Sequence, residues 1–299
     1  MRRWVNEAVG RRGGGWRLLA ALALLGVVVG CSTPDPKVRY NLRLAGAQIP
    51  VELVESWLAD APDVRFVTER VQPVAWSEAG LRHLQRGECD LACTDRPLTA
   101  REVGKFGDRA IVGHRVGFYG FAFYVHPDNP TDSIYAGHIK LLFRKQINDW
   151  RELGPFEGPI RLIGPEKATR GGEILMRQAR IWFADATWET RPDDRSIVAA
   201  VAADPLALGF AGIGLDGPGA RYLGLRMERH GEPAWPAIED IESERYGLAK
   251  VIYVYTADPP GPAAQAAIDY LYGDDARRVM QRTQVWQIPR SRGEVQPVP

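Results

Sequence analysis

Hydrophobic and polar side chains follow two periods along the first third of the chain. Val38–Leu44 alternates apolar and polar residues, as a strand does, whereas Ile49–Leu58 carries its apolar residues at helical spacing. The same succession continues in a strand, a helix and a short strand, at Val64–Val71, Ser77–Gln85 and Asp90–Cys93. Thr99, with Glu102 three residues later, is a capping box that begins a further helix. This alternation predicts an α/β lobe with a mostly parallel sheet.

Two long apolar segments interrupt the alternation. Ala110–His126 and Leu248–Thr256 are too apolar and aromatic for surface loops, so they predict long strands. The chain between them predicts a second α/β block, with helices at His138–Arg144, Gly172–Phe183 and Ser196–Ala202 and strands at Ile160–Gly164 and Ala207–Ile213. Helices at Pro262–Tyr272 and Asp275–Arg282 follow the second long strand. The chain thus leaves one lobe by the first long strand, builds a second lobe, and returns by the second.

This order predicts an α/β protein of two lobes, with two hinge strands crossing between them and a ligand cleft between the lobes. We assign residues 38–117 and 249–289 to lobe 1, and residues 118–248 to lobe 2. Residues 290–299 are expected to form a flexible tail.

The first 30 residues are typical of an export signal. The apolar run Leu18–Val29 follows an arginine-rich segment, and its twelve residues are too few to span a bilayer core of about 30 Å as a helix. The run ends at Cys31, in a sequence that resembles the bacterial lipobox, and residues 31–37 form a polar, proline-rich tether. The alternative is an uncleaved N-terminal anchor with an incidental cysteine. Lipidation would hold the protein in the periplasm or cell envelope, and Ser32 fits outer-membrane sorting if the organism is Gram-negative.

Charge and composition exclude one class of partner. The formal net charge is +1, and residues 1–30 hold five Arg and one Glu, so the remaining 33 basic and 36 acidic residues give −3. A nucleic-acid surface needs a basic excess, so we expect no nucleic-acid partner. The composition is otherwise that of an ordinary globular protein, with 45% apolar and 25% charged residues.

Beyond Cys31 the chain has two cysteines, Cys89 and Cys93. If they lie on a strand, four residues at about 3.3 Å each separate their Cα atoms beyond the roughly 7 Å limit of a disulfide. We therefore expect two free, buried thiols. A disulfide and a metal site are the weaker alternatives, since no pair of histidines stands nearby at ligand spacing.

Several local motifs follow one another in a recognisable order. The segment from Cys89 to Thr99, with Asp95-Arg96-Pro97-Leu98 at its centre, resembles a family motif of a strand followed by Ser-Asp-x-Pro-Leu. Further matches are Asn148–Gly154, Leu208–Gly212 and Ile252–Tyr255. Over residues 40–289 their order is similar to that of the phosphate-binding proteins of bacterial phosphate ABC transporters. The resemblance implies a type II periplasmic binding protein fold that holds phosphate between its lobes.

A small tetrahedral anion is best held by backbone N–H groups at helix N-termini and by a few hydroxyls. Three predicted helix starts supply such donors. Ala47 and Gln48 begin the first helix, and Ser77 begins the second as its N-cap and hydroxyl donor. Thr169, Arg170 and Gly171 begin a helix of lobe 2. For each start the alternative is a structural cap without a ligand.

By the resemblance, Asp95 is the residue that selects phosphate. An ionised carboxylate only accepts hydrogen bonds, so it can accept the proton that HPO4 carries. Sulfate carries no such proton, and an unpaired Asp95 would repel it. The alternative role of Asp95 is to cap the helix that follows it.

The chain departs from the family at the main positive charge of the site. Pro165 stands where the family has an arginine, and Thr169-Arg170-Gly171 stands where the family has Ser-Gly-Thr. We hypothesise that Arg170, or alternatively Arg96, restores the missing charge. Otherwise Arg170 points to solvent.

Catalysis has little support in the sequence. The five histidines are scattered, and neither a Gly-x-Ser-x-Gly elbow nor a Gly-x-x-x-x-Gly-Lys loop occurs. Asp193 and Asp194 are expected in a loop with their charges solvated. We therefore expect a monomeric binding protein without enzymatic activity, cofactor or metal. Its expected partners are inorganic phosphate, permease subunits of an ABC transporter, and a membrane through the lipid anchor. The alternatives are a signalling or scaffold lipoprotein that has lost transport, or a receptor for another oxyanion.

Overall fold

A computed structural model describes residues 38–72, 76–106, 110–166, 187–215, 217 and 219–295 of the chain. Four predictions lie outside these residues: the export signal, Cys31 with its tether, the helix at 172–183, and the donors Thr169, Arg170 and Gly171.

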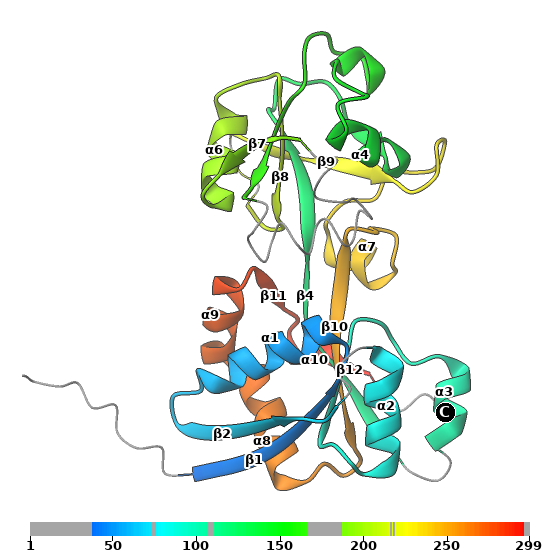
Figure 1. Ribbon diagram of the computed structural model, residues 1–299, viewed down its shortest axis with the longest axis vertical. Helices are drawn as coiled ribbons and strands as arrows, with labels where there is room; N and C mark the ends of the chain where they lie inside the picture. The colour runs from blue at the N-terminus through cyan, green and yellow to red at the C-terminus, as the bar shows by residue number, and fades with distance from the viewer. Residues whose placement is uncertain are drawn as a thin grey trace, which may run out of the picture. The chain divides into compact units, whose positions relative to one another are not determined.

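Lobe 1 begins with alternating strands and helices, as predicted (Figure 1). Its first elements are β1 (Val38–Gly46), α1 (Gln48–Ala59), β2 (Val64–Arg70), α2 (Ser77–Arg86), β3 (Leu91–Thr94) and α3 (Ala100–Phe106). Strand β1 lies between β2 and β3 and is parallel to both. The sheet continues from β3 to β10 (Ala249–Ala257), which is antiparallel to β3, and then to β4 (Ile111–Val125), which is antiparallel to β10. Because β1, β2 and β3 are parallel, the helices that follow them begin at the same edge of the sheet.

Successive side chains of the lobe 1 strands enter two separate cores. Leu44 of β1 packs in a cluster with residues of α1, whereas its neighbour Ala45 packs in a cluster with residues of α2. Helices α8 (Pro262–Leu271) and α9 (Asp274–Arg282) contribute to the cluster of α1, and α3 contributes to that of α2. The period of two along each strand therefore places α1, α8 and α9 on one face of the sheet and α2 and α3 on the other.

Strand β4 belongs to both lobes. Its first part, up to Gly120, pairs with β10, and Phe121–Val125 pairs instead with β8 (Ala207–Gly212). Strand β10 returns the chain to lobe 1. These are the two long strands that the apolar segments predict.

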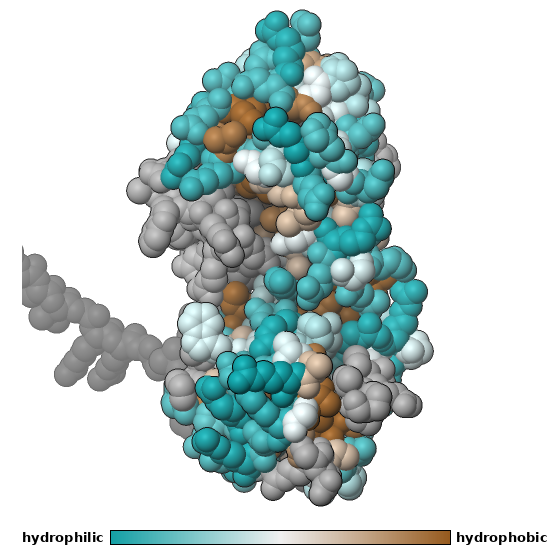
Figure 2. All heavy atoms as spheres, turned by 90° about the vertical axis from the view of Figure 1, so that its right-hand side faces the viewer, coloured by the Kyte–Doolittle hydropathy of each residue, from teal (hydrophilic) through white to brown (hydrophobic). Residues whose placement is uncertain are grey.

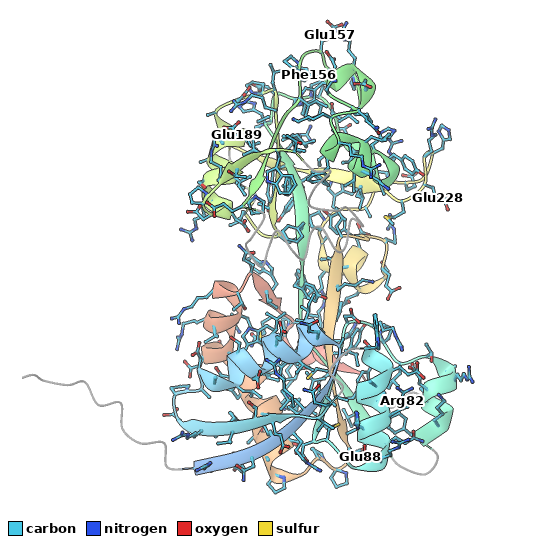
Figure 3. All side chains as sticks on the ribbon, viewed as in Figure 1. Arg82, Glu88, Phe156, Glu157, Glu189 and Glu228 are labelled. Carbon is cyan, nitrogen blue, oxygen red and sulfur yellow. The ribbon has the colours of Figure 1, made fainter. Side chains whose placement is uncertain are left out.

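Lobe 2 is a second α/β unit. Strands β6 (Arg161–Pro165), β7 (Glu189–Arg191) and β8 are parallel. Its remaining described elements are β5 (Ser133–Tyr135), α4 (Ala136–Phe143), the 3-10 helix η1 (Trp150–Glu152), α6 (Asp194–Ala202), β9 (Arg221–Arg226) and α7 (Ile238–Glu242). Glu189, labelled in Figure 3, lies on β7 and pairs with Arg161 of β6 at 2.7 Å between Oε2 and Nη2. The core is aromatic, with the Phe210 ring 4.9 Å from that of Phe143 and 5.1 Å from that of Trp188.

The C-terminal segment differs from the predicted flexible tail. After β11 (Val285–Gln287), residues 290–295 form the short helix α10 (Arg290–Gly293) and the strand β12 (Glu294–Val295). Strand β12 pairs with His114 and Gly113 of β4. Backbone pairing holds this segment, and a two-residue strand has no hydrophobic pattern that a sequence could reveal.

The predicted α/β fold of two lobes with two hinge strands is confirmed. On the face shown in Figure 2, hydrophilic side chains predominate and hydrophobic ones are confined to small areas, as expected when most apolar residues are buried in the interior. No helix among the described residues is both long and apolar enough to cross a membrane.

Candidate ligand-binding site

The register of β1 against β3 brings two predicted site segments to the same edge of the lobe 1 sheet. Gly46, the last residue of β1, is paired with Cys93 near the end of β3. Ala47 follows Gly46 as the N-cap of α1, and its N–H donates to the carbonyl of Cys93 at 3.0 Å. Asp95 follows β3 immediately. Because parallel strands end at one edge, Asp95 and the start of α1 meet there.

Two glycines bring the second helix start to this edge. Gly46 has φ +136°, and a Cβ there would lie 1.9 Å from the carbonyl oxygen of Cys93. A Cβ on Gly80, in the first turn of α2, would lie 2.5 Å from the Cα of Gly46. The start of α2 therefore packs directly against the turn between β1 and α1, at a distance that only glycine permits.

Ser77 and Asp95 form the centre of the site. The Ser77 hydroxyl donates to Oδ1 of Asp95 at 2.8 Å, and the N–H of Asp95 lies 3.4 Å from the Ser77 oxygen. Ser77 is 6% exposed and Asp95 is half-buried. The structure thus brings together two residues that the sequence placed at the site.

The predicted N-cap role of Ser77 is wrong. Trp76 occupies the N-cap position of α2, and no side chain caps the helix there. Ser77 is the first helical residue, so its hydroxyl is available to Asp95 and does not bind the backbone of its own helix.

The start of α1 offers fewer donors than its position suggests. The N–H of Ala47 is engaged by Cys93, and Pro50 has no N–H. The first-turn N–H groups of Gln48 and Ile49 have no carbonyl to bind within the helix, so they are the candidate backbone donors of this helix start. The Gln48 side chain donates to Glu52 at 3.1 Å, which leaves its backbone as the part available to the site.

The turn that carries Asp95 is fixed by its own hydrogen bonds. Thr94 Oγ1 donates to the carbonyl of Arg96 at 2.8 Å, and the N–H of Leu98 donates to the Tyr255 hydroxyl at 3.1 Å. The N–H and hydroxyl of Thr99 donate to Glu102, and the N–H of Glu102 is 3.3 Å from Thr99 Oγ1. The predicted capping box is confirmed, and Thr99, not Asp95, caps α3.

Arg96 is held by Glu102 and makes no hydrogen bond to Asp95. Its Nη1 and Nη2 atoms donate to the two carboxylate oxygens at 2.8 and 2.7 Å. These bonds, opposed by burial and supported by the Thr99 donors, lower the pKa of Glu102 to about 2. In this state Arg96 does not supply the positive charge that the hypothesis considered for it.

Lobe 2 contributes Pro165 at the end of β6, and its carbonyl accepts the indole N–H of Trp188 at 2.8 Å. The donors that follow Pro165 in sequence, Thr169, Arg170 and Gly171, lie outside the described residues. The geometry of the candidate site is therefore that of its lobe 1 half.

Asp194 is buried at the start of α6, so its predicted place in a solvated loop is wrong. It is 8% exposed, accepts the N–H of Gly212 at 2.8 Å, and has a pKa raised by the loss of solvation. Asp193 caps α6 through a capping box with Ser196. The spacing of Asp193 and Ser196, three residues apart, is the sequence signal that could have predicted a helix beginning at Asp194.

Asp194 also lines a cavity of about 590 Å³, together with Trp286 of β11.

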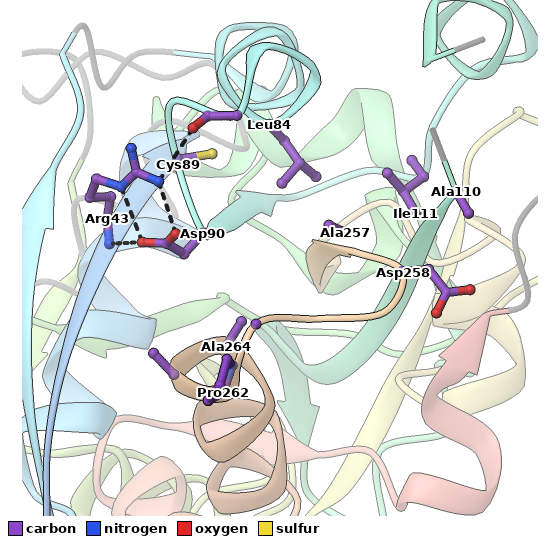
Figure 4. Close-up of a pocket in the computed structure, with 13 residues that line it drawn as sticks. Arg43, Leu84, Cys89, Asp90, Ala110, Ile111, Ala257, Asp258, Pro262 and Ala264 are labelled. Carbon is purple, nitrogen blue, oxygen red and sulfur yellow. Dashed lines mark hydrogen bonds and ion pairs between the residues drawn. The ribbon is translucent and has the colours of Figure 1, made fainter. Parts of the chain in front are cut away.

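A second cavity lies at the other end of β3 from the candidate site. It has a volume of about 590 Å³, and its lining includes Arg43, Cys89 and Asp90 (Figure 4). Arg43 Nη2 pairs with Oδ1 of Asp90 at 3.0 Å. Because the guanidinium and carboxylate neutralise each other, this cavity offers less to a charged ligand than the Asp95 edge.

The predicted free, buried thiols are confirmed. Cys89 and Cys93 are buried and unbridged. Burial raises the pKa of Cys89 to about 12 and raises that of Cys93 as well, so both remain protonated and unreactive. Within the ranges described above, no group of three or more His, Cys, Asp or Glu side chains is arranged to hold a metal ion.

Comparisons with known proteins agree with the motifs. Residues 32–275 match the PBP superfamily domain. The phosphate-binding protein PstS of Bacillus subtilis (strain 168) is 21% identical over 249 residues, which cover 82% of this chain and 79% of that protein.

Solved structures show the same fold at low identity. A possible phosphate binding protein from Planctomyces limnophilus DSM 3776 has a TM-score of 0.62 at 16% identity, covering 85% of this chain and 95% of that chain. An ABC-type phosphate transport receptor from Vibrio cholerae has a TM-score of 0.53 at 16% identity, covering 84% of this chain and 100% of that one. The resemblance expected from the motifs is confirmed.

Proposed function

The chain belongs to the PBP superfamily, and from this we propose that it is an extracytoplasmic lipoprotein that binds phosphate between its lobes. The bound form would deliver phosphate to the permease subunits of an ABC transporter. Binding would be reversible, with no chemical step and no cofactor. The proposed ligand residues are Gln48, Ser77, Asp95, Thr169, Arg170 and Gly171 of the predicted set, together with Ile49. Ala47 is left out, because its N–H donates to the carbonyl of Cys93.

The Ser77–Asp95 pair is the observation that carries the proposal. Asp95 accepts one hydrogen bond from Ser77 at 2.8 Å, and an ionised carboxylate has about four lone-pair sites. Its remaining sites can accept the proton of HPO4, while the backbone N–H groups of Gln48 and Ile49 donate to the other oxygens. A site of this kind accepts a protonated tetrahedral anion and discriminates against an unprotonated one.

The second lobe would close the site through Thr169, Arg170 and Gly171. In this proposal Arg170 provides the charge that Pro165 cannot, and Arg170→Ala weakens phosphate binding at least tenfold. An unchanged affinity would reject that role for Arg170.

Calorimetric titration of the 32–299 fragment tests the function. This fragment contains every described residue, all of them in one compact unit, Pro36–Pro299. Phosphate and arsenate, which both carry a proton at neutral pH, are expected to bind, and sulfate is expected not to. Absence of heat with phosphate would reject the function.

Asp95→Asn provides the second arm of the test. The amide can donate to sulfate, so this variant is expected to bind sulfate and to lose affinity for phosphate. Asp90→Asn is the matched control. Asp90 directly precedes β3, at the end of the strand opposite to Asp95, and its substitution removes the same charge. If both variants behave alike, the effect is one of net charge and not of the site.

A signalling or scaffold lipoprotein is the second candidate function, and Pro165 at the position of the family arginine favours it. Thermal denaturation separates the two. A ligand that binds only the folded state stabilises it by about 2.7 kcal/mol at one hundred times its Kd. A melting temperature that phosphate does not raise would support the scaffold role.

A further inference from the structure

We propose that Glu102 is a positioning residue for ligand specificity: it holds Arg96 away from Asp95, so that Asp95 remains a free hydrogen-bond acceptor. The inference rests on the proposed function, because it concerns how the site distinguishes phosphate from sulfate. It adds a residue that does not touch the ligand.

The cation nearest to Asp95 in sequence is held by other groups. Arg96 follows Asp95 directly, and its guanidinium makes three bonds: two to Glu102, at 2.8 and 2.7 Å, and one to the carbonyl of Pro97 at 2.9 Å. A bidentate arginine–carboxylate pair fixes both distance and plane. All three hydrogen bonds of the guanidinium therefore go to Glu102 and Pro97, and none goes to Asp95.

Glu102 is itself fixed in place. The N–H and hydroxyl of Thr99 donate to its Oε2 at 2.9 and 2.8 Å, and the residue is 7% exposed. With its pKa near 2, Glu102 stays ionised at the pH of a cell, where phosphate carries at least one proton. The capping box thus does two things: it begins α3, and it holds the carboxylate that binds Arg96.

Arg96 is nonetheless within the electrostatic field of Asp95. The hydrogen bonds of Glu102 raise the pKa of Arg96, and the charge of Asp95 adds to that rise. If Glu102 did not hold it, Arg96 would be drawn to Asp95. A guanidinium there would fill the lone-pair sites that Ser77 leaves open and cancel the negative charge that repels sulfate.

Three variants of the 32–299 chain test this inference: Glu102→Gln, Arg96→Gln and the double variant. Glu102→Gln keeps the size of the side chain but removes its charge, so Arg96 is expected to turn to Asp95. The ratio of sulfate to phosphate affinity, measured by calorimetry, should rise at least tenfold. Arg96→Gln alone should leave this ratio unchanged, and adding Arg96→Gln to Glu102→Gln should restore it.

The restoration distinguishes positioning from mere support of the fold, since a structural defect would persist in the double variant. A ratio that stays constant in Glu102→Gln, or that the double variant does not restore, overturns the inference. A crystal structure of Glu102→Gln gives a readout without ligand: Arg96 within ion-pair distance of Asp95 supports the proposal, and Arg96 elsewhere rejects it. Because this readout needs no anion, it separates failure of the inference from failure of the wild-type chain to bind phosphate.

Discussion

Glu102 lies almost fully buried beneath the turn that carries Asp95, and its ionisation should be visible in the stability of the whole protein. Its pKa is lowered to about 2, first by the hydrogen bonds of Arg96. An unfolded Glu titrates near 4.3, so the folded state gains stability above that pH and loses it as the pH falls towards 2. Arg96 has a side chain 34% exposed, which screens the pair. We expect Glu102→Gln to cost about 1–2 kcal/mol at pH 7.

Urea denaturation at pH 7 and pH 3 measures this effect. The difference in unfolding free energy between wild type and Glu102→Gln should shrink at the lower pH. At pH 3 Glu102 is protonated in the unfolded chain but still ionised in the folded protein, so protonation favours the unfolded state of the wild type. Asp274, which pairs with Arg277 at 3.0 Å and has a side chain 79% exposed, is a control site where Asp274→Asn should change little at either pH. A difference for Glu102→Gln that is equal at both pH values would contradict the assigned pKa.

Sequence reasoning found the residues of the lobe 1 half of the site but not all of their roles. Asp95 and Ser77 were placed together because both follow parallel strands, and the sheet register brings them into contact. Ser77 was taken for an N-cap, since residue type alone does not separate the N-cap from the first helical position. Asp194 was missed because its burial depends on Gly212, a residue 18 positions later that approaches only in the folded chain.

Among the elements, the turn between β1 and α1 has the strictest steric requirement that bears on the site. Gly46 adopts φ +136°, and any Cβ there would overlap the carbonyl oxygen of Cys93. Gly46→Ala must therefore move the turn, and we expect it to destabilise the protein by about 3 kcal/mol or more. Thermal or urea denaturation measures this loss. Phosphate binding should fail as well, since the start of α1 would leave the edge of the sheet.

Gly104 provides the control for that substitution. It lies exposed in α3, and a Cβ there would meet nothing within 4 Å. Because glycine is a poor helix former, Gly104→Ala should leave stability unchanged or raise it by up to about 1 kcal/mol. Similar losses in both variants would show that the requirement at Gly46 is not steric.

The elements that the sequence predicted best are those with a clear period. Strands β1, β2 and β4 and helices α1, α2, α8 and α9 begin and end within two residues of the expected positions. Strands β5, β7, β9, β11 and β12 were not predicted. They are short, and their partners lie far away in the sequence, so their hydrogen bonds follow from the tertiary fold and not from a local pattern.

At the scale of the whole molecule, the two lobes follow from two strands that are apolar along their length. Strand β4 pairs with β10, β11 and β12 in lobe 1 and with β8 and β9 in lobe 2, so it is central in the sheet. In lobe 1 its two faces enter different cores, since Phe118 packs in one cluster and Val116 and Tyr119 pack in the other. A strand whose two faces are both buried needs apolar residues on both, which explains why the hinge was visible in the sequence. The sequence did not predict a hydrogen bond that joins the lobes beside the hinge, in which Trp286 of β11 donates its indole N–H to the carbonyl of Ile213 at 2.8 Å.

The attachment of the molecule to a membrane is a proposal that Cys31 can test. In a bacterial host that processes lipoproteins, we expect the mature chain to begin at Cys31 with acyl groups on that residue, and to fractionate with membranes. Cys31→Ala should carry no acyl group and should keep its phosphate affinity, because the described fold lies within residues 38–295. Intact-mass measurement of the purified protein shows where the mature chain begins and whether Cys31 is acylated.

Cys89→Ala is the matched control: that thiol is buried, its pKa is raised to about 12, and it should be neither acylated nor needed for anchoring. A mature wild-type chain that retains residues 1–30, or that lacks acyl groups at Cys31, would instead support the uncleaved anchor.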